Sequence, residues 1–253
     1  MGNMNYRYRT SSISFGGPLT PVVRNIIIAC VAVFVIQLLA GSYVTLLFSL
    51  TPALVLTKFY FWQFFTYMFL HDRNDILHLL FNMLSLFMFG CELERHWGSR
   101  RFFQYYCFTG IAAGLCVFVI PSNYYTSTLG ASGAIYGVLL AYGLTFPDRI
   151  LYLYLLFPLP AKYFVMVIGG IVFLTALASS NNGVANAAHL GGMAFGYLYL
   201  KKFVRGRRAG RSMSLFSGLK DSYYQWKLKR ARRKFAVYLN KKERDRDKNE
   251  TIH

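Results

Sequence analysis

Charged residues are scarce in this sequence, and acidic residues are the scarcest. Of the 253 residues, 15% are charged and only 10 are Asp or Glu, whereas 55% are hydrophobic. In soluble domains about a quarter of the residues are charged. The composition therefore excludes an ordinary soluble domain and predicts a protein of the lipid bilayer.

Cysteine is also rare, and the arrangement of the cysteines excludes two kinds of scaffold. The four residues are Cys30, Cys91, Cys107 and Cys116. They show no metal-ligand spacing, and all lie in apolar stretches, where a free thiol behaves as a small hydrophobic group. We expect neither a disulfide framework nor a metal site built on them.

Long apolar runs are abundant. A membrane-spanning helix needs roughly 20 apolar residues, and six runs qualify, some of them short. They are residues 26–40, 75–91, 102–120, 130–146, 163–178 and 184–200. No small-residue cleavage site precedes the first run, so we expect a retained span rather than a signal peptide. Residues 54–70 contain Lys58, Gln63 and interfacial aromatic side chains. We place them as a membrane-embedded loop between spans one and two.

The distribution of positive charge predicts the orientation of the spans, because Lys and Arg in short loops stay on the cytoplasmic side. Six spans place the basic N-terminus, residues 92–101, residues 148–162 and the basic tail together on that side. A seventh span would move the tail outside. We therefore expect three parts, namely a cytoplasmic N-terminal segment (1–24), a six-helix membrane domain (25–204) and a cytoplasmic tail (205–253).

Four polar residues stand near the starts of spans two, four and six, which all run in the same direction. They are His78, Asn82, Ser132 and His189. Strongly polar groups within spans are costly and tend to mark function. Taken singly each has a structural reading, since a serine can bond to its own helix and an asparagine can link two helices.

Glycines on spans four and six favour a functional reading. Gly133 and Gly137 on one span, and Gly192 and Gly196 on the other, form small-residue faces that let two backbones approach closely. His189 lies on the same face as Gly192, and Ser132 adjoins Gly133. Close packing would bring a hydroxyl to an imidazole, the pair that activates a serine nucleophile.

Few carboxylates can complete this pair. Asp72 and Asp75 are the acidic residues expected on the same side of the membrane as the pair. We therefore predict a Ser-His dyad rather than a triad, with His189 oriented by packing against Tyr136, one helical turn beyond Ser132.

An oxyanion site is predicted from the second span. His78 and Asn82 are spaced by four residues, so both side chains can direct hydrogen-bond donors at one point. The backbone N–H of Ser132, at a helix N-terminus, adds a third donor.

At these residues the sequence resembles the rhomboid intramembrane serine proteases. The segments that carry the resemblance are HLLFNM, ELERHWGSRRFFQYYCFTG, GASGAIYG and AHLGGMAFG, within residues 62–200. The resemblance implies a six-helix core, Ser132 as nucleophile, His189 as general base and then acid, and His78 with Asn82 in the oxyanion hole. Substrates are then membrane-anchored proteins whose spans unwind near the surface.

The resemblance also sets expectations for other residues. Gly130, Gly133, Gly192 and Gly196 are expected to permit close packing around the site. The family's embedded loop carries a Trp-Arg pair, whereas here Trp62 is followed by Gln63, a departure that concerns loop anchoring rather than chemistry. Family members without the serine or the histidine are not proteolytic, and this chain keeps both.

The tail carries most of the positive charge, with eighteen Lys or Arg against five Asp or Glu after residue 200. Apolar residues recur in it at helical spacing, at Tyr224, Leu228, Ala231, Phe235 and Tyr238. This pattern predicts a basic amphipathic helix that binds anionic lipid, at about 1 kcal/mol per basic residue near the surface. Nucleic acid is a less favoured partner.

Other functions remain as alternatives to an active protease. A metalloprotease would require a zinc site from His71, His78 and His189, but no HExxH pair is present, and we expect no metal or cofactor. A small transporter would require internal repeats, which are not found. A non-proteolytic rhomboid-like scaffold that binds transmembrane helices is the main alternative.

Overall fold

The computed structural model describes residues 17–118, 124–153, 157–178 and 183–209. The chain divides into two compact units, Met1–Leu200 and Lys201–His253. The fold described below is that of the first unit. The predicted amphipathic helix of the tail lies outside the described residues.

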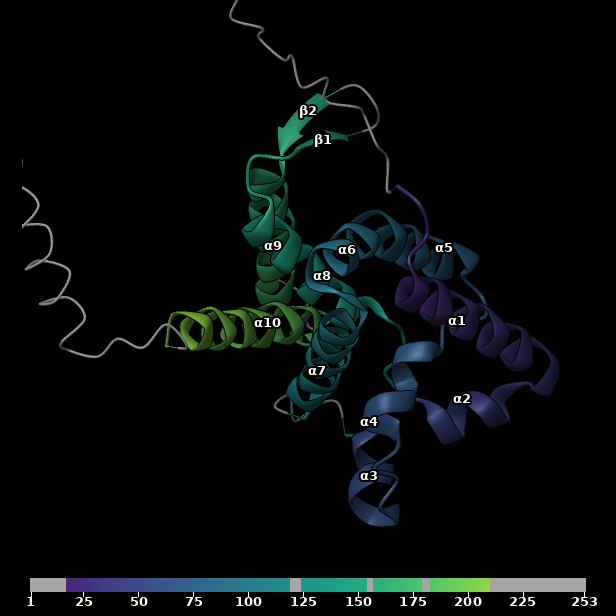
Figure 1. The fold of residues 1–253 in the computed structure, drawn as a ribbon. Helices are drawn as coiled ribbons and strands as arrows, with labels where there is room; N and C mark the ends of the chain where they lie inside the picture. The colour runs from purple at the N-terminus through teal and green to yellow at the C-terminus, as the bar shows by residue number, and fades with distance from the viewer. Residues whose placement is uncertain (1–16, 119–123, 154–156, 179–182, 210–253) are drawn as a thin grey trace, which may run out of the picture. The chain divides into compact units, whose positions relative to one another are not determined.

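The first unit is built almost entirely from helices (Figure 1). The helices are α1 (Pro21–Ala40), α2 (Ser42–Phe48), α3 (Pro52–Lys58), α4 (Gln63–Thr66), α5 (Ile76–Ser85), α6 (Cys91–Trp97), α7 (Ser99–Val117), α8 (Ser132–Thr145), α9 (Ala161–Ala178) and α10 (Gly183–Ala209). A 3₁₀ turn, Tyr67–Phe69, follows α4, and a π-helical turn, Leu86–Gly90, joins α5 to α6. Helix α8 contacts α5, α7 and α9 and so lies inside the group.

Helix α1 begins where a distant carboxylate accepts its unpaired backbone N–H groups. Pro21 occupies the first helical position, which needs no donor. Glu94, on α6, accepts hydrogen bonds from the N–H groups of Val22 and Val23, both at 3.0 Å, and from the Thr20 hydroxyl at 2.5 Å. Glu94 is 2% exposed, so its carboxylate joins α6 to α1 inside the protein.

The segment predicted as a membrane-embedded loop forms short helices around a buried amide. Gln63 is fully buried. Its Oε1 accepts from the Thr51 N–H at 3.0 Å, and its Nε2 donates to the carbonyls of Leu46 at 3.4 Å and Leu47 at 3.2 Å. The Trp62 indole also donates to Leu47, at 3.0 Å. These bonds tie α2, α3 and α4 together.

A two-stranded antiparallel sheet corrects the prediction of an all-helical fold. Strands β1 (Ile150–Leu153) and β2 (Phe157–Pro160) pair with Ile150 opposite Pro160, in the connection between α8 and α9. Short apolar runs do not distinguish strand from helix by periodicity, so the sequence pattern could not reveal the hairpin.

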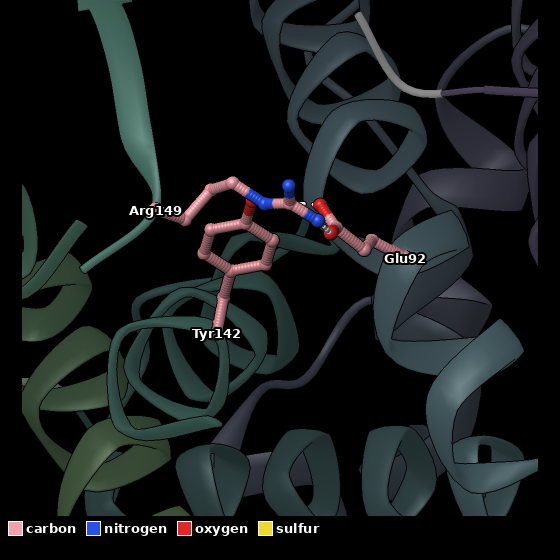
Figure 2. Close-up of polar contacts among 3 residues, drawn as sticks. All are labelled: Glu92, Tyr142 and Arg149. Carbon is pink, nitrogen blue, oxygen red and sulfur yellow. Dashed lines mark hydrogen bonds and ion pairs between the residues drawn. The ribbon is translucent and has the colours of Figure 1, made fainter. Parts of the chain in front are cut away.

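The hairpin is joined to the helices by a polar cluster. Glu92 on α6 accepts a hydrogen bond from the Tyr142 hydroxyl of α8 at 2.7 Å and forms an ion pair with Arg149, just before β1 (Figure 2). The bond to Glu92 raises the pKa of the Arg149 guanidinium. Three elements from different parts of the sequence therefore meet at one carboxylate.

Among the residues that the structure describes, two helical stretches are long and apolar enough to cross a membrane, by length and composition: Pro21–Ala40 and Ile76–Trp97. Ser132–Thr145 and Ala161–Ala176 are shorter apolar helices. Large apolar side chains point outward from α1 and α9, including Ile28, Leu38, Met166 and Leu174. Such exposure is rare on soluble monomers and typical of lipid-facing helices.

Candidate active site

The hydroxyl of Ser132 lies at hydrogen-bonding distance from the ring of His189. Ser132 is the first residue of α8, and His189 stands in the second turn of α10. The Ser132 Oγ and His189 Nε2 atoms are 2.8 Å apart, although 57 residues separate them in the sequence. This is the reach that a general base needs to take a proton from a nucleophile.

Glycines allow the two helices to come this close. A Cβ atom on Gly192 would overlap the carbonyl oxygen of Gly133, so the backbones of α10 and α8 are in contact. A Cβ atom on Gly133 would lie 2.6 Å from the Ala113 Cβ, and one on Gly196 would lie 2.5 Å from the Tyr105 hydroxyl. Ala113 and Tyr105 belong to α7, so this helix also packs against the contact between α8 and α10.

Tyr136 stacks on His189. Their ring centroids are 4.2 Å apart and their planes differ by 23°. Tyr136 is one turn after Ser132, so α8 supplies both the hydroxyl that faces the imidazole and the ring that holds it. The Tyr136 ring therefore covers one face of the imidazole.

His78 lies against the same corner of the structure, on the first turn of α5. The Asp75 carboxylate caps this helix by accepting the N–H groups of Leu77 at 3.0 Å and His78 at 3.3 Å. A Cβ atom on Gly130 would lie 3.0 Å from His78 Cε1 and 3.8 Å from Ser132 Oγ. The His78 ring and the Ser132 hydroxyl thus share the space beside Gly130.

Position 130 calls for glycine because of its backbone conformation as well as because of the nearby His78 ring. Its φ is +119°, a conformation that L side chains rarely adopt. Its N–H donates to the Tyr67 carbonyl at 2.9 Å, which fixes the entry to α8. The backbone can therefore turn sharply and present Ser132 at the start of the helix.

Asn82 follows His78 by one turn and is buried, with 7% of its surface exposed. Its Nδ2 has no hydrogen-bond partner among the residues that the structure describes. Buried amide donors are almost always paired, so a bare one calls for an explanation.

His71, to which sequence reasoning gave no catalytic role, joins this group. Its ring centroid lies 5.3 Å from that of His78. The loop before α5 brings the two together, and no periodic pattern in the sequence signals such a contact. Within the described ranges, no group of three or more His, Cys, Asp or Glu side chains is arranged to hold a metal ion.

Together the fold and the site define a class of protein, a helical membrane protein with a serine and a histidine apposed between two glycine-packed helices. The model of the Rhomboid domain matches residues 58–206, which is more than half of the chain. The chain belongs to the rhomboid family.

Several relatives are similar over about half of the chain. "Rhomboid protein 1, mitochondrial" of Saccharomyces cerevisiae is 34% identical over 133 residues, covering 51% of this chain and 38% of the relative. "Putative rhomboid protease YdcA" of Bacillus subtilis is 30% identical, covering 54% and 64%. "RHOMBOID-like protein 12, mitochondrial" of Arabidopsis thaliana is 27% identical, covering 53% and 44%. The chain thus spans less than two thirds of the length of each of these relatives.

Proposed function

We propose that this rhomboid is an intramembrane serine endopeptidase, with Ser132 as nucleophile and His189 as general base. The observation that carries the proposal is the 2.8 Å separation of Ser132 Oγ and His189 Nε2. Family membership supports it, because rhomboids are usually intramembrane serine proteases. The name of the Bacillus subtilis relative points to the same activity.

The reaction follows from the positions of these two side chains. Ser132 Oγ attacks the carbonyl carbon of the scissile peptide bond while His189 Nε2 accepts the hydroxyl proton. His189 then gives this proton to the amide nitrogen as the carbon–nitrogen bond breaks, leaving an acyl ester on Ser132. Water hydrolyses the ester, with His189 again as base, and the hydroxyl is restored.

An oxyanion develops on the attacked carbonyl, and we assign three donors to it. His78 shares the space beside Gly130 with the Ser132 hydroxyl, and Asn82 carries a buried Nδ2 without a partner in the described part of the chain. The backbone N–H of Ser132, at the start of α8, adds the positive end of a helix dipole. Donors fixed before the reaction stabilise the charge without reorganisation.

The membrane topology belongs to the proposal too. We assign six spans to residues 25–204, with residues 54–70 as an embedded loop and with the N-terminus and the tail (205–253) on one basic side. Arg149 and the hairpin lie on that side, and the Ser132 end of α8 faces the opposite one. The two mitochondrial relatives suggest that this basic side is the cytoplasm or a mitochondrial matrix, depending on the membrane.

The substrates of such an enzyme are membrane-anchored proteins. A peptide bond within an intact helix is shielded by its hydrogen bonds, so a substrate span must unwind near the surface before Ser132 can reach it. The tail, by its sequence alone, adds a contact with anionic lipid.

Labelling by a fluorophosphonate serine probe tests the nucleophile. The parent protein should be labelled in detergent or liposomes, whereas the Ser132→Ala variant should not be labelled. Ser42→Ala is the matched control, because Ser42, the first residue of α2, is exposed and its substitution should leave labelling unchanged. Equal labelling of the parent and Ser132→Ala would instead favour a non-proteolytic scaffold that binds transmembrane helices.

A further inference from the structure

His71 is fully buried in the loop that leads into α5. Neither of its ring nitrogens has a hydrogen-bond partner in the parts of the chain that the structure describes, although the Phe69 backbone lies nearby. Burying an imidazole in this way is costly, because the ring gives up its hydrogen bonds to water. An apolar ring would fill the same space without that cost.

The His71 ring contacts the ring of His78 edge to face. The centroids are 5.3 Å apart and the planes are inclined by 61°. His78 in turn lies against Gly130, beside the Ser132 hydroxyl. His71 is therefore in contact with the side chain to which we assign oxyanion stabilisation.

The backbone of His71 is held by α1 rather than by its own loop. Gln37, a fully buried residue of α1, donates from Nε2 to the His71 carbonyl at 3.1 Å. Its Oε1 accepts the His71 N–H at 3.0 Å. One amide thus binds both backbone groups of His71. The backbone that carries the His71 ring is therefore fixed in position beside His78.

We propose that His71 is a positioning residue for His78, an inference that rests on the proposed protease function. A neutral imidazole has a single N–H. If His78 donates that N–H to the oxyanion, its other nitrogen must act as an acceptor. An N–H of His71 that donates to this nitrogen when substrate is bound selects the required tautomer and limits rotation of the His78 ring.

Substitutions at His71 separate positioning from packing. His71→Phe keeps a ring and removes both nitrogens, so kcat should fall by about tenfold with little change in KM. The melting temperature of His71→Phe should not fall, because an unpartnered polar group is removed. His71→Asn and His71→Gln each keep an N–H donor, and one of them should recover most of the lost kcat.

A double-mutant cycle with His78→Ala gives the decisive readout, measured on the full chain in liposomes with a transmembrane substrate. If His71 acts through His78, His71→Phe should cause no further loss of kcat in the His78→Ala background. The same loss in both backgrounds, or full activity of His71→Phe, overturns the positioning role. A parent protein that neither cleaves nor is labelled by the serine probe overturns the protease function and this inference together.

Discussion

The backbones of Gly133 and Gly192 are in direct contact, so that a single methyl group on Gly192 would overlap the carbonyl oxygen of Gly133. One residue before Gly133 stands Ser132, and three residues before Gly192 stands His189. The 2.8 Å approach of hydroxyl and imidazole therefore depends on a contact between two helices that only glycine permits.

Gly192→Ala should separate α8 from α10 and so affect both stability and activity. Because the neighbour is backbone rather than a flexible side chain, the overlap cannot be relieved locally. We expect a loss of about 2–3 kcal/mol in the free energy of unfolding, and at least tenfold in kcat, since small displacements of a reacting pair are costly.

Gly170→Ala is the matched control for this change. Gly170 lies in α9, and a Cβ atom built on it meets nothing within 4 Å. Alanine should leave activity unchanged there and, as the better helix former, should not lower the melting temperature. Equal effects of the two substitutions would contradict the helix-contact account.

Tyr136→Phe and Tyr136→Leu test whether stacking orients His189. The ring contact at 4.2 Å requires an aromatic ring but not the hydroxyl. Phe should keep kcat within about twofold, whereas Leu should lower it by roughly tenfold, because the imidazole loses one face of its support. Steady-state kinetics with one transmembrane substrate measures both, and equal kcat values for the two variants would argue against stacking.

Glu94→Gln should destabilise the protein although it preserves shape. Oε1 of Glu94 accepts the Val22 N–H and Oε2 accepts the Val23 N–H, so an amide in either orientation turns its NH₂ toward a backbone donor. We expect a loss of about 2–3 kcal/mol in the free energy of unfolding, measured by thermal or denaturant unfolding in detergent.

Glu92→Gln is the corresponding control on the same helix. The ion pair between Glu92 and Arg149 is partly exposed, since the Arg149 side chain has 56% of its surface accessible. The Tyr142 hydroxyl, which donates to Glu92, can rotate to face an amide in its place. The loss should be below about 1 kcal/mol. A larger loss of stability for Glu92→Gln than for Glu94→Gln would contradict the assignment of Glu94 as the carboxylate that stabilises the fold.

Gln63→Arg should weaken the loop, even though arginine restores the Trp-Arg pair expected from the family. The Gln63 Oε1 accepts the Thr51 N–H at 3.0 Å, and arginine has no acceptor to offer. The substitution also places a charge at a fully buried position. We expect destabilisation of about 2 kcal/mol, and a rise in melting temperature would contradict this interpretation.

The arrangement around Ser132 could be anticipated because its determinants are local or periodic. Glycines at spacings of four mark a helix face, and polar residues at the starts of the predicted spans two, four and six point to one depth. From these, Ser132, His189 and Tyr136 can be placed together without knowledge of any loop. The structure brings these three side chains into contact.

Other features depend on contacts between distant segments, and no sequence pattern predicts these contacts. Glu94 caps α1 across more than 70 residues, and His71 reaches His78 through an irregular loop. The hairpin at 150–160 has an apolar pattern that suits a helix equally well. Each is determined by tertiary packing rather than by local propensity.

The most direct test of the central claim is cleavage of a transmembrane substrate by purified protein in liposomes. The parent and Ser42→Ala should release product at the same rate, and Ser132→Ala and His189→Ala should each lose nearly all activity, because removing one member disables the nucleophile and base as a unit. Cleavage by Ser132→Ala at the parental rate would contradict the assignment of Ser132 as the nucleophile.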